Sequence, residues 1–403
     1  MTRESAVGRR RILKYTGTLA ATGLTGLAGC TGNSSNSGEN TSESENTTTS
    51  GETTASETTA TNEVREELGL QSLDYELEDS LNILQWAQYW PSDTVANFEK
   101  AYGVSVNVSN YASNEELYNK LKAGGTDQYD LIFPSDSMLT IMANQDMLKP
   151  IDTGKIPNWD NLLSNFQNPS YDPGSETYAA PYQWGTTGIG WNTDVIGDVE
   201  IDSWNAMWNS EFSGNITMLD SMRSSFGGAL KRLGYSLNTT DEDKVEEAKQ
   251  ALIEQKSLLQ AYDSSTYREK LENSSASPVQ GWSGAVLRAR ENTMSSGESP
   301  VNYVVPKEGA PIWTDSGAVT SKAKHPNAAH AFINYFLNAK VGASISNLVR
   351  YASPNDAAKE YMDETLVQTA YPDQKTMDNL EYFEPLGKAT QMYSEAWTEV
   401  KTA

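Results

Sequence analysis

Residues 181–192, Pro-Tyr-Gln-Trp-Gly-Thr-Thr-Gly-Ile-Gly-Trp-Asn, constrain the fold more than any other stretch of the chain. The run is apolar and aromatic, and Gly185, Gly188 and Gly190 interrupt it. Glycine inside a strand usually marks a bulge, a bend or a point where another backbone comes close. We interpret the run as a strand that crosses between two flexing lobes, and an ordinary core strand with turn glycines is the alternative.

Strand and helix patterns alternate on both sides of this run. Residues 81–133 predict a β-α-β-α-β unit, and residues 215–305 predict a second set of strands and helices. A glycine-containing run at 313–320 can carry the chain back to the first set. About 320 residues exceed what one core usually supports, so we predict an α/β fold with two lobes. The expected boundaries place 81–185 with 315–358 in one lobe and 186–314 with 359–403 in the other.

The first 30 residues are typical of an export signal. Arg9-Arg10-Arg11-Ile-Leu-Lys matches the twin-arginine pattern, and a short apolar run follows it. The run ends in Leu-Ala-Gly-Cys30, which resembles the lipobox of prokaryotic lipoproteins. We therefore predict that residues 1–30 are a twin-arginine lipoprotein signal, that Cys30 is lipidated, and that the protein is anchored at the extracellular face of the membrane. An uncleaved, buried anchor is the alternative. As the only cysteine, Cys30 leaves no disulfide to form.

The next segment predicts an anchor tether. From residue 31 to about 62 the chain holds Ser, Thr, Asn, Gly and Glu with almost nothing apolar. Such a composition cannot bury enough surface to offset the entropy of ordering. We expect residues 31–80 to form a disordered, acidic Ser/Thr tether.

The charge of the chain excludes one class of partner. The formal net charge is −24 and the pI is about 4.5, so nucleic acid is not an expected partner, because phosphate binding needs the opposite sign. Surplus surface carboxylate suits a protein of very salty, halophilic surroundings, and attraction of cationic ligands is the other account. At ~1 M salt the Debye length is only ~3 Å, so long-range steering would be lost. We favour salt adaptation and expect recognition to depend on a few buried carboxylates.

No catalytic or cofactor motif is evident. The two histidines, His325 and His330, begin a helical segment and are interpreted as surface or helix-end polar groups. No phosphate-binding glycine loop and no paired Cys or His at metal-ligand spacing occur. We predict no enzyme activity, no cofactor and no metal, although a carboxylate-pair hydrolase stays open.

Aromatic residues are the positive signal for a ligand. The chain has 10 Trp and 20 Tyr against 8 Phe, and several lie at predicted strand ends beside polar residues. Aromatic faces with a buried carboxylate suit an ammonium group, while stacking on sugars is the competing use of the same faces.

Several motifs, in order and with similar spacing from about 81 to 371, resemble one family. They are Gln-Trp-Ala-Gln-Tyr at 85–89, Tyr-Asp-Leu-Ile-Phe-Pro-Ser at 129–135, the glycine run from 181, Leu-Asp at 219–220 with 232–241, Pro-Lys-Glu-Gly at 306–309 with Trp-Thr-Asp-Ser at 313–316, and Tyr-Ala-Ser-Pro-Asn at 351–355. The chain thereby resembles the spermidine/putrescine-binding proteins of ABC importers. The resemblance implies a periplasmic-binding-protein-like (type II) fold with crossing hinge strands, which closes over a ligand and docks on a membrane permease. We expect a monomer.

The resemblance also implies a ligand site. The matching positions that would wall the slot or hydrogen-bond a ligand are Trp86, Tyr89, Ser135, Trp282, Trp313 and Tyr351, with Asp315 pairing an ammonium.

Departures from the family pattern affect the expected site for the second amine group of a diamine ligand. Ser221 and Ser224 replace amine-binding acids, Ala285 replaces another, and Phe383 stands where a glutamine is expected. We hypothesise that the ligand is a polyamine bound with fewer acids, Asp136 substituting for one.

A molecule with a single cationic end is the alternative, and Arg350 would then meet a ligand carboxylate, as in a zwitterionic amine. A surface carbohydrate-binding protein also stays open.

Overall fold

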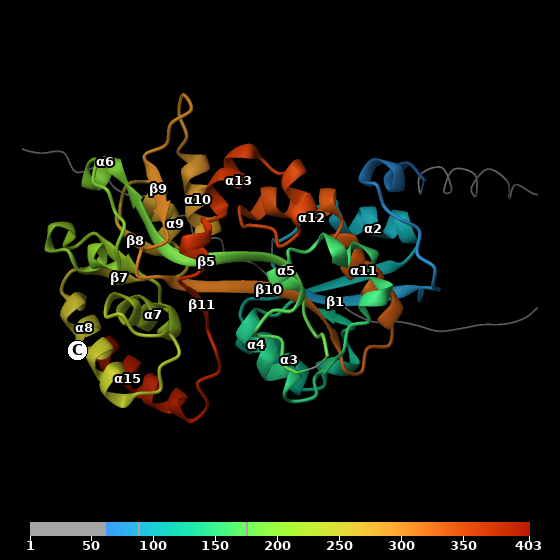
Figure 1. Cartoon of the computed structure of the whole chain (residues 1–403), viewed down its shortest axis with the longest axis horizontal. Coiled ribbons are helices and arrows are strands. Elements are labelled where there is room, and N and C mark those ends of the chain that lie inside the picture. The colour runs from blue at the N-terminus through green and yellow to red at the C-terminus, as the bar shows by residue number, and fades with distance from the viewer. Residues whose placement is uncertain (1–61, 88, 175) are drawn as a thin grey trace, which may run out of the picture. The chain divides into compact units, whose positions relative to one another are not determined.

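Two long strands cross between the lobes of the protein. The computed structural model describes residues 62–87, 89–174 and 176–403 (Figure 1). Strand β5 spans Ala180–Asn192 and strand β10 spans Ala310–Thr320, and the two pair antiparallel. The prediction of crossing strands at both glycine-containing runs is confirmed.

The first lobe, shown to the right in Figure 1, is built on a mainly parallel sheet. Strand β1 pairs in parallel with β2 and β3, and β10 continues the sheet antiparallel to β3 and β4. The strands are β1 Ser80–Trp86, β2 Ser105–Tyr111, β3 Leu131–Ile132 and β4 Leu148–Lys149. The helices are α2 Thr94–Tyr102, α3 Asn114–Lys122, α4 Asp136–Ala143, α5 Ser164–Gln167, α11 Pro326–Phe336 and α12 Ala339–Val349.

The second lobe repeats this plan on the other side of the crossing strands. Strand β6 pairs in parallel with β7 and β8, while β8 and β9 each pair antiparallel with β5. The strands are β6 Ile216–Met218, β7 Leu259–Tyr262, β8 Val279–Trp282 and β9 Val301–Val304. The helices are α6 Thr193–Ile196, α7 Met222–Arg232, α8 Glu242–Lys256, α9 Tyr267–Glu272, α10 Ser283–Asn292 and α15 Thr390–Thr402. The main sheet path runs β2-β1-β3-β10-β5-β8-β6-β7 through both lobes.

The remaining elements lie between and after these. A 3-10 helix at Asp356–Tyr361 is followed by α13 Glu364–Ala370, α14 Gln374–Met377 and strand β11 Leu380–Tyr382, which pairs with β10. The other 3-10 helices are Gly125–Asp127, Thr153–Lys155, Pro157–Asn161, Trp204–Trp208, Ser210–Phe212 and Gly387–Ala389. The lobe boundaries expected at 185, 314 and 358 stay a prediction.

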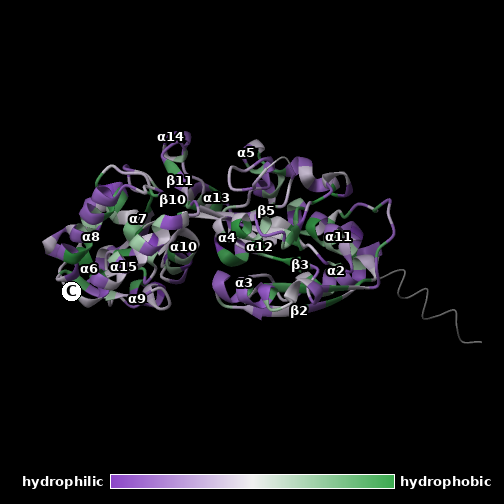
Figure 2. Cartoon of the chain, turned by 90° about the horizontal axis from the view of Figure 1, so that it is seen from below, coloured by the Kyte–Doolittle hydropathy of each residue, from purple (hydrophilic) through white to green (hydrophobic). Residues whose placement is uncertain are grey.

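Each lobe has its own core. Phe98, Phe133 and Phe332 lie in the first-lobe core, and Trp204 and Phe226 lie in the second. Figure 2 shows hydrophobic residues along the inner strands and hydrophilic residues on the outward faces of the helices.

The glycines of β5 allow close packing. A Cβ atom added at Gly188 would lie 2.3 Å from the carbonyl oxygen of Val304, and one at Gly190 would lie 2.7 Å from the Val286 side chain. Strand β5 can therefore approach β9 and α10 only because these positions lack side chains.

Helix starts follow the sequence signals. The Ser113 Oγ accepts the Glu116 N–H at 3.1 Å, and the Glu116 carboxylate accepts the Ala112 N–H at 2.8 Å, so side chains satisfy backbone donors at the start of α3. Asp241 caps α8 by accepting the N–H groups of Asp243 and Lys244.

The last part of the predicted tether is folded. Residues 62–68 are helical, and Leu68, Leu70, Leu73 and Leu77 pack against the first-lobe core. The Glu78 carboxylate accepts the N–H groups of residues 327 and 328 at the start of α11. The tether prediction is therefore wrong for residues 62–79. The composition argument fails there because leucines return after residue 67. The predictions for residues 1–61, including Cys30, lie outside the described residues.

The histidines differ from each other. His325 begins α11 and contacts Asp130, as expected for a helix-end group. His330 is 4% exposed, and its Nε2 accepts the Asp152 N–H while its Nδ1 donates to the Pro326 carbonyl. The surface prediction is therefore wrong for His330, which links α11 to the segment after β4. Burial lowers its pKa, consistent with a neutral ring that accepts one bond and donates one.

Within the described ranges, no helix combines the length and apolarity needed to cross a membrane.

Candidate functional site

A cavity of about 580 Å³ lies at the carboxyl ends of strands from both lobes, and we call it the interlobe cavity. Strand β1 ends at Trp86, β8 ends at Trp282, and Ser135 follows β3. This is where ligands bind in open α/β sheets. The structure brings together around this cavity every residue of the predicted ligand site: Trp86, Tyr89, Ser135, Asp136, Trp282, Trp313, Asp315 and Tyr351.

Asp315 is the buried carboxylate that β10 places in the cavity wall. It is 2% exposed, and the backbone register of β10 against β5 shifts between Asp315 and Ser316. The Ser135 Oγ donates to its Oδ1 at 2.6 Å, and the Gln183 Nε2 donates to its Oδ2 at 2.9 Å. Burial raises the pKa of Asp315 to about 6, although both hydrogen bonds oppose this. The carboxylate has neutral donors and no cationic partner among the described residues, so a cationic ligand would stabilise its charged form.

Asp136 lies beside it at the start of α4. Its Oδ1 accepts the Ser137 N–H at 2.5 Å, and its Oδ2 accepts the Thr314 N–H at 3.1 Å. Burial raises the pKa of Asp136 to about 8. These bonds hold α4 against β10, and whether Asp136 also pairs a ligand amine stays a prediction.

Aromatic rings form the walls. The ring centroids of Trp86 and Tyr89 are 5.9 Å apart in a stacked arrangement, and Trp313 meets Tyr351 edge to face at 4.7 Å. The Trp86 Nε1 donates to the Phe133 carbonyl at 2.9 Å, which fixes that ring. The Trp313 Nε1 has no hydrogen-bond partner among the described residues.

A close glycine contact positions Tyr351. A Cβ atom at Gly284 would lie 2.4 Å from the Tyr351 ring. The start of α10 can therefore approach this wall only without a side chain at that position.

The second lobe contributes a polar wall that includes a cation. Ser221, Ser224 and Phe383, which we identified as departures from the family pattern, line the cavity, whereas Ala285 does not. Sequence reasoning missed Arg223, the only cation among the described lining residues. The sequence feature that could have identified Arg223 is its position between Ser221 and Ser224, at the start of a helix that follows a strand. The further lining residues are Ala112, Asn114, Glu115, Ser137, Thr187, Ser264 and Ser265.

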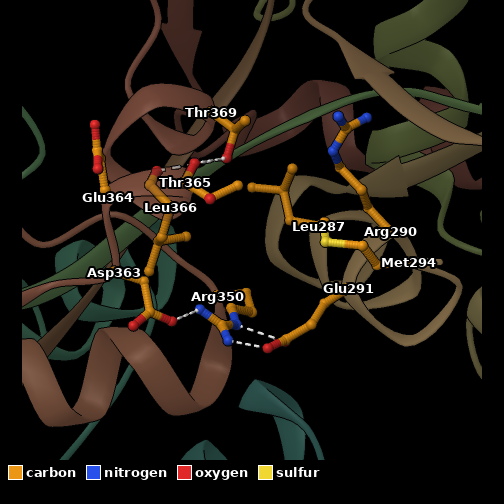
Figure 3. A pocket seen from close by; sticks show the side chains of 10 residues that line it. All are labelled: Leu287, Arg290, Glu291, Met294, Arg350, Asp363, Glu364, Thr365, Leu366 and Thr369. Atoms are coloured by element: carbon orange, nitrogen blue, oxygen red, sulfur yellow. Dashed lines mark hydrogen bonds and ion pairs between the residues drawn. The ribbon is translucent and has the colours of Figure 1, made fainter. Parts of the chain in front are cut away.

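Arg350 does not face this cavity. It lines a separate pocket, where its Nε donates to the Glu291 Oε2 at 2.7 Å and its Nη1 pairs with Asp363 (Figure 3). Arg350 caps α12 in the left-handed conformation, with φ of 62°, and its guanidinium pairs with Glu291 of α10. The hypothesis that Arg350 meets a ligand carboxylate in the cavity is therefore wrong.

Among the described residues, no group of three or more His, Cys, Asp or Glu side chains is arranged to hold a metal ion.

The chain matches a known family and its solved structures. The family model for bacterial extracellular solute-binding proteins matches residues 93–376. The spermidine/putrescine-binding periplasmic protein of Escherichia coli K12 is 32% identical over 336 residues, which cover 83% of this chain and 95% of that protein. The putrescine-binding periplasmic protein PotF of the same organism is 33% identical over 345 residues, covering 81% and 92%.

A solved structure agrees. The spermidine/putrescine ABC transporter substrate-binding protein PotD from Streptococcus pneumoniae superposes with a TM-score of 0.74 at 31% identity, covering 81% of this chain and 99% of that one. The residues matched by the family model include both crossing strands, β5 and β10. The chain therefore belongs to the bacterial extracellular solute-binding proteins and, among them, to the spermidine/putrescine-binding protein family of ABC importers.

Proposed function

We propose that this protein captures a polyamine of the spermidine/putrescine type in the interlobe cavity and delivers it to the permease of an ABC importer. The observation that carries the proposal is the position of Asp315 in an aromatic-walled cavity between two lobes, where this buried carboxylate has no cationic partner in the described part of the chain. A buried carboxylate is stabilised by a cation, and aromatic faces attract one.

Different residues of the cavity walls would contact different parts of the ligand. Trp86, Trp313 and Tyr351 would contact the methylene chain and the ammonium, because aromatic rings offer both apolar area and a negative face. Asp315 would accept hydrogen bonds from the ammonium, and the pairing would lower its pKa from about 6. Ser135 and Tyr89 would supply further hydrogen bonds. A transport role without catalysis is part of the proposal, because the relatives of this chain are solute-binding proteins.

The N-terminal motifs support the cellular setting of this proposal. A twin-arginine signal and lipidation at Cys30 would place a monomeric binding protein on the outer face of the cell membrane, next to its permease. The net charge of −24 supports a halophilic origin. Loss of membrane association in Cys30→Ser, with the protein recovered in the medium, would test the anchor.

Isothermal titration calorimetry with the purified chain tests the function. We expect spermidine or putrescine to bind at one site per chain, with glucose and maltose giving no heat above dilution. Binding of a sugar in place of both amines would overturn the proposal. Loss of amine binding in Trp313→Ala, but not in Trp208→Ala, would locate the site, because Trp208 does not line the interlobe cavity.

A further inference from the structure

The two walls of the interlobe cavity carry opposite charges. The acidic side chains that line it, Glu115, Asp136 and Asp315, all come from the first lobe or from β10. Among the described residues that the second lobe contributes to the lining there is no acid. That wall holds serines, Phe383 and the guanidinium of Arg223.

Arg223 is held in place by neutral groups. Its Nη1 donates to the Glu384 carbonyl at 2.9 Å, its Nη2 donates to the Asn238 Oδ1 at 2.8 Å, and its guanidinium lies 4.5 Å from the centre of the Phe383 ring. It forms no salt bridge with any described residue, while Asp136, the acid across the cavity, already accepts two backbone N–H groups. The guanidinium is therefore fixed in position without a salt bridge to any described residue.

The surrounding groups increase this positive character. Arg223 is the second residue of α7, an 11-residue helix whose N-terminus faces the cavity through Ser221 and Ser224. The N-terminal end of a helix favours negative charge. In the same wall, the buried Oγ of Ser264 has no hydrogen-bond partner among the described residues. This side of the cavity offers hydroxyl groups and positive charge, and its described residues include no carboxylate to pair an ammonium.

A ligand with an ammonium at each end is complementary in charge to only one of the two walls. Its second ammonium would lie near a like charge with no carboxylate to pair it, and a buried unpaired charge is costly. An oxygen acceptor at that end would instead accept charge-assisted hydrogen bonds from a prearranged guanidinium. We propose that the preferred ligand is a linear amine with one ammonium, held at Asp315, and an oxygen acceptor at its far end, held by Arg223 with Ser221 and Ser224. This inference rests on the proposed function and names the ligand class of the same site.

Calorimetry with four-carbon ligands of matched length tests the inference. Putrescine carries two ammonium groups, N-acetylputrescine carries one ammonium and an amide, and 4-aminobutyrate carries one ammonium and a carboxylate. We expect at least one of the two acceptor-bearing ligands to bind roughly tenfold or more tightly than putrescine. The comparison between them distinguishes a neutral from an anionic acceptor.

Two variants test the role of the wall. Arg223→Gln should weaken the preferred acceptor-bearing ligand by about 10- to 100-fold without weakening putrescine. Arg232→Gln is the matched control, because Arg232 lies on the same helix, donates to Asn205 and packs over Trp208 outside the cavity. Should Arg223→Gln not fold, Ser221→Asp still tests the idea: it keeps an N-cap residue, adds a carboxylate, and should raise putrescine affinity and lower that of 4-aminobutyrate.

The outcomes separate the two proposals. If putrescine or spermidine binds as tightly as the acceptor-bearing ligands or more tightly, the inference fails and the proposed function stands. If only the acceptor-bearing ligands bind, the inference stands and the capture of an unmodified polyamine fails. If no amine binds, both proposals fail.

Discussion

Replacing Asp315 with asparagine should have opposite effects on stability and on ligand binding. The carboxylate is 2% exposed and has no cationic partner among the described residues. Its pKa is about 6, against an ordinary value of 3.8, and burial is the main cause. At pH 7.5, where the group is mostly ionised, this difference corresponds to a stability cost on the order of 3 kcal/mol.

Asparagine removes that cost without removing the hydrogen bonds. Its carbonyl oxygen can accept from Ser135, and its new N–H group can donate to the Gln183 Oε1 once that amide turns over; this oxygen has no partner among the described residues. We therefore expect the melting temperature of the ligand-free Asp315→Asn chain to rise by a few degrees.

Ligand affinity should fall in the same variant. An ammonium in the cavity would lose its charged acceptor, which is worth about 3 kcal/mol, or roughly a 100-fold rise in Kd.

The assays are differential scanning calorimetry of the ligand-free chain and isothermal titration with its preferred amine. Asp172→Asn is the matched control, because burial also raises the pKa of Asp172 to about 6 while the residue lies outside the interlobe cavity. Asp172→Asn should change Kd by no more than about twofold, which is well short of a tenfold change (~1.4 kcal/mol). An Asp315→Asn chain that melts several degrees lower, or binds the amine as well as the parent, would refute the reasoning.

Three further predictions concern pH, packing and the N-terminal segment. Burial in the folded state raises the pKa of Asp315 to about 6 and that of Asp136 to about 8. The contribution of these two groups to the stability of the folded state is therefore largest below about pH 4, where both carboxyl groups are protonated, and it is lost as the pH rises through 6 and 8. Melting curves from pH 4 to 9 should show this loss in the ligand-free chain, whereas the extra stability from an added amine should grow as pH rises through 6, and a flat ligand effect would contradict it. Gly185→Ala should weaken amine binding about tenfold in titration calorimetry, because its Cβ would lie 2.5 Å from the Trp313 ring; Gly342→Ala, whose Cβ meets nothing closer than 3.4 Å, should not. A chain that begins at residue 81 should be at least about 3 kcal/mol less stable to denaturant than one that begins at residue 62, because it lacks the packed leucines and the Glu78 cap of α11; equal stability would show that these contacts contribute nothing.

The sequence was sufficient to predict the fold and the site where local sequence patterns agree with the tertiary structure. The glycines of 185–190 indicated a strand that other backbone approaches closely, and the structure shows why: Val304 and Val286 occupy the space that side chains would fill. The aromatic and acidic residues at strand ends converged on one cavity because parallel strands end at the same edge of a sheet.

Other features depend on tertiary contacts that no local pattern records. Arg350 precedes a cavity residue in sequence, but a left-handed helix cap turns it toward Glu291 and Asp363. His330 looked like a helix-end group, and only the packing of α11 against Asp152 buries it. No local pattern is enough to establish Arg223 as a cavity residue. Its place in the wall depends on residues about 160 positions away in the sequence.

The described part of the chain starts on the first lobe and ends on the second. Residues 68–77 pack on the first-lobe core, whereas α15 packs against α8 in the second lobe (Figure 1). Closure of the lobes would therefore keep residue 62 with the first lobe and carry α15 with the second. A donor fluorophore near residue 66 and an acceptor near residue 402 would consequently form a ruler for lobe motion. Their energy transfer would follow each capture and release of solute in real time, with both labels far from the aromatic walls.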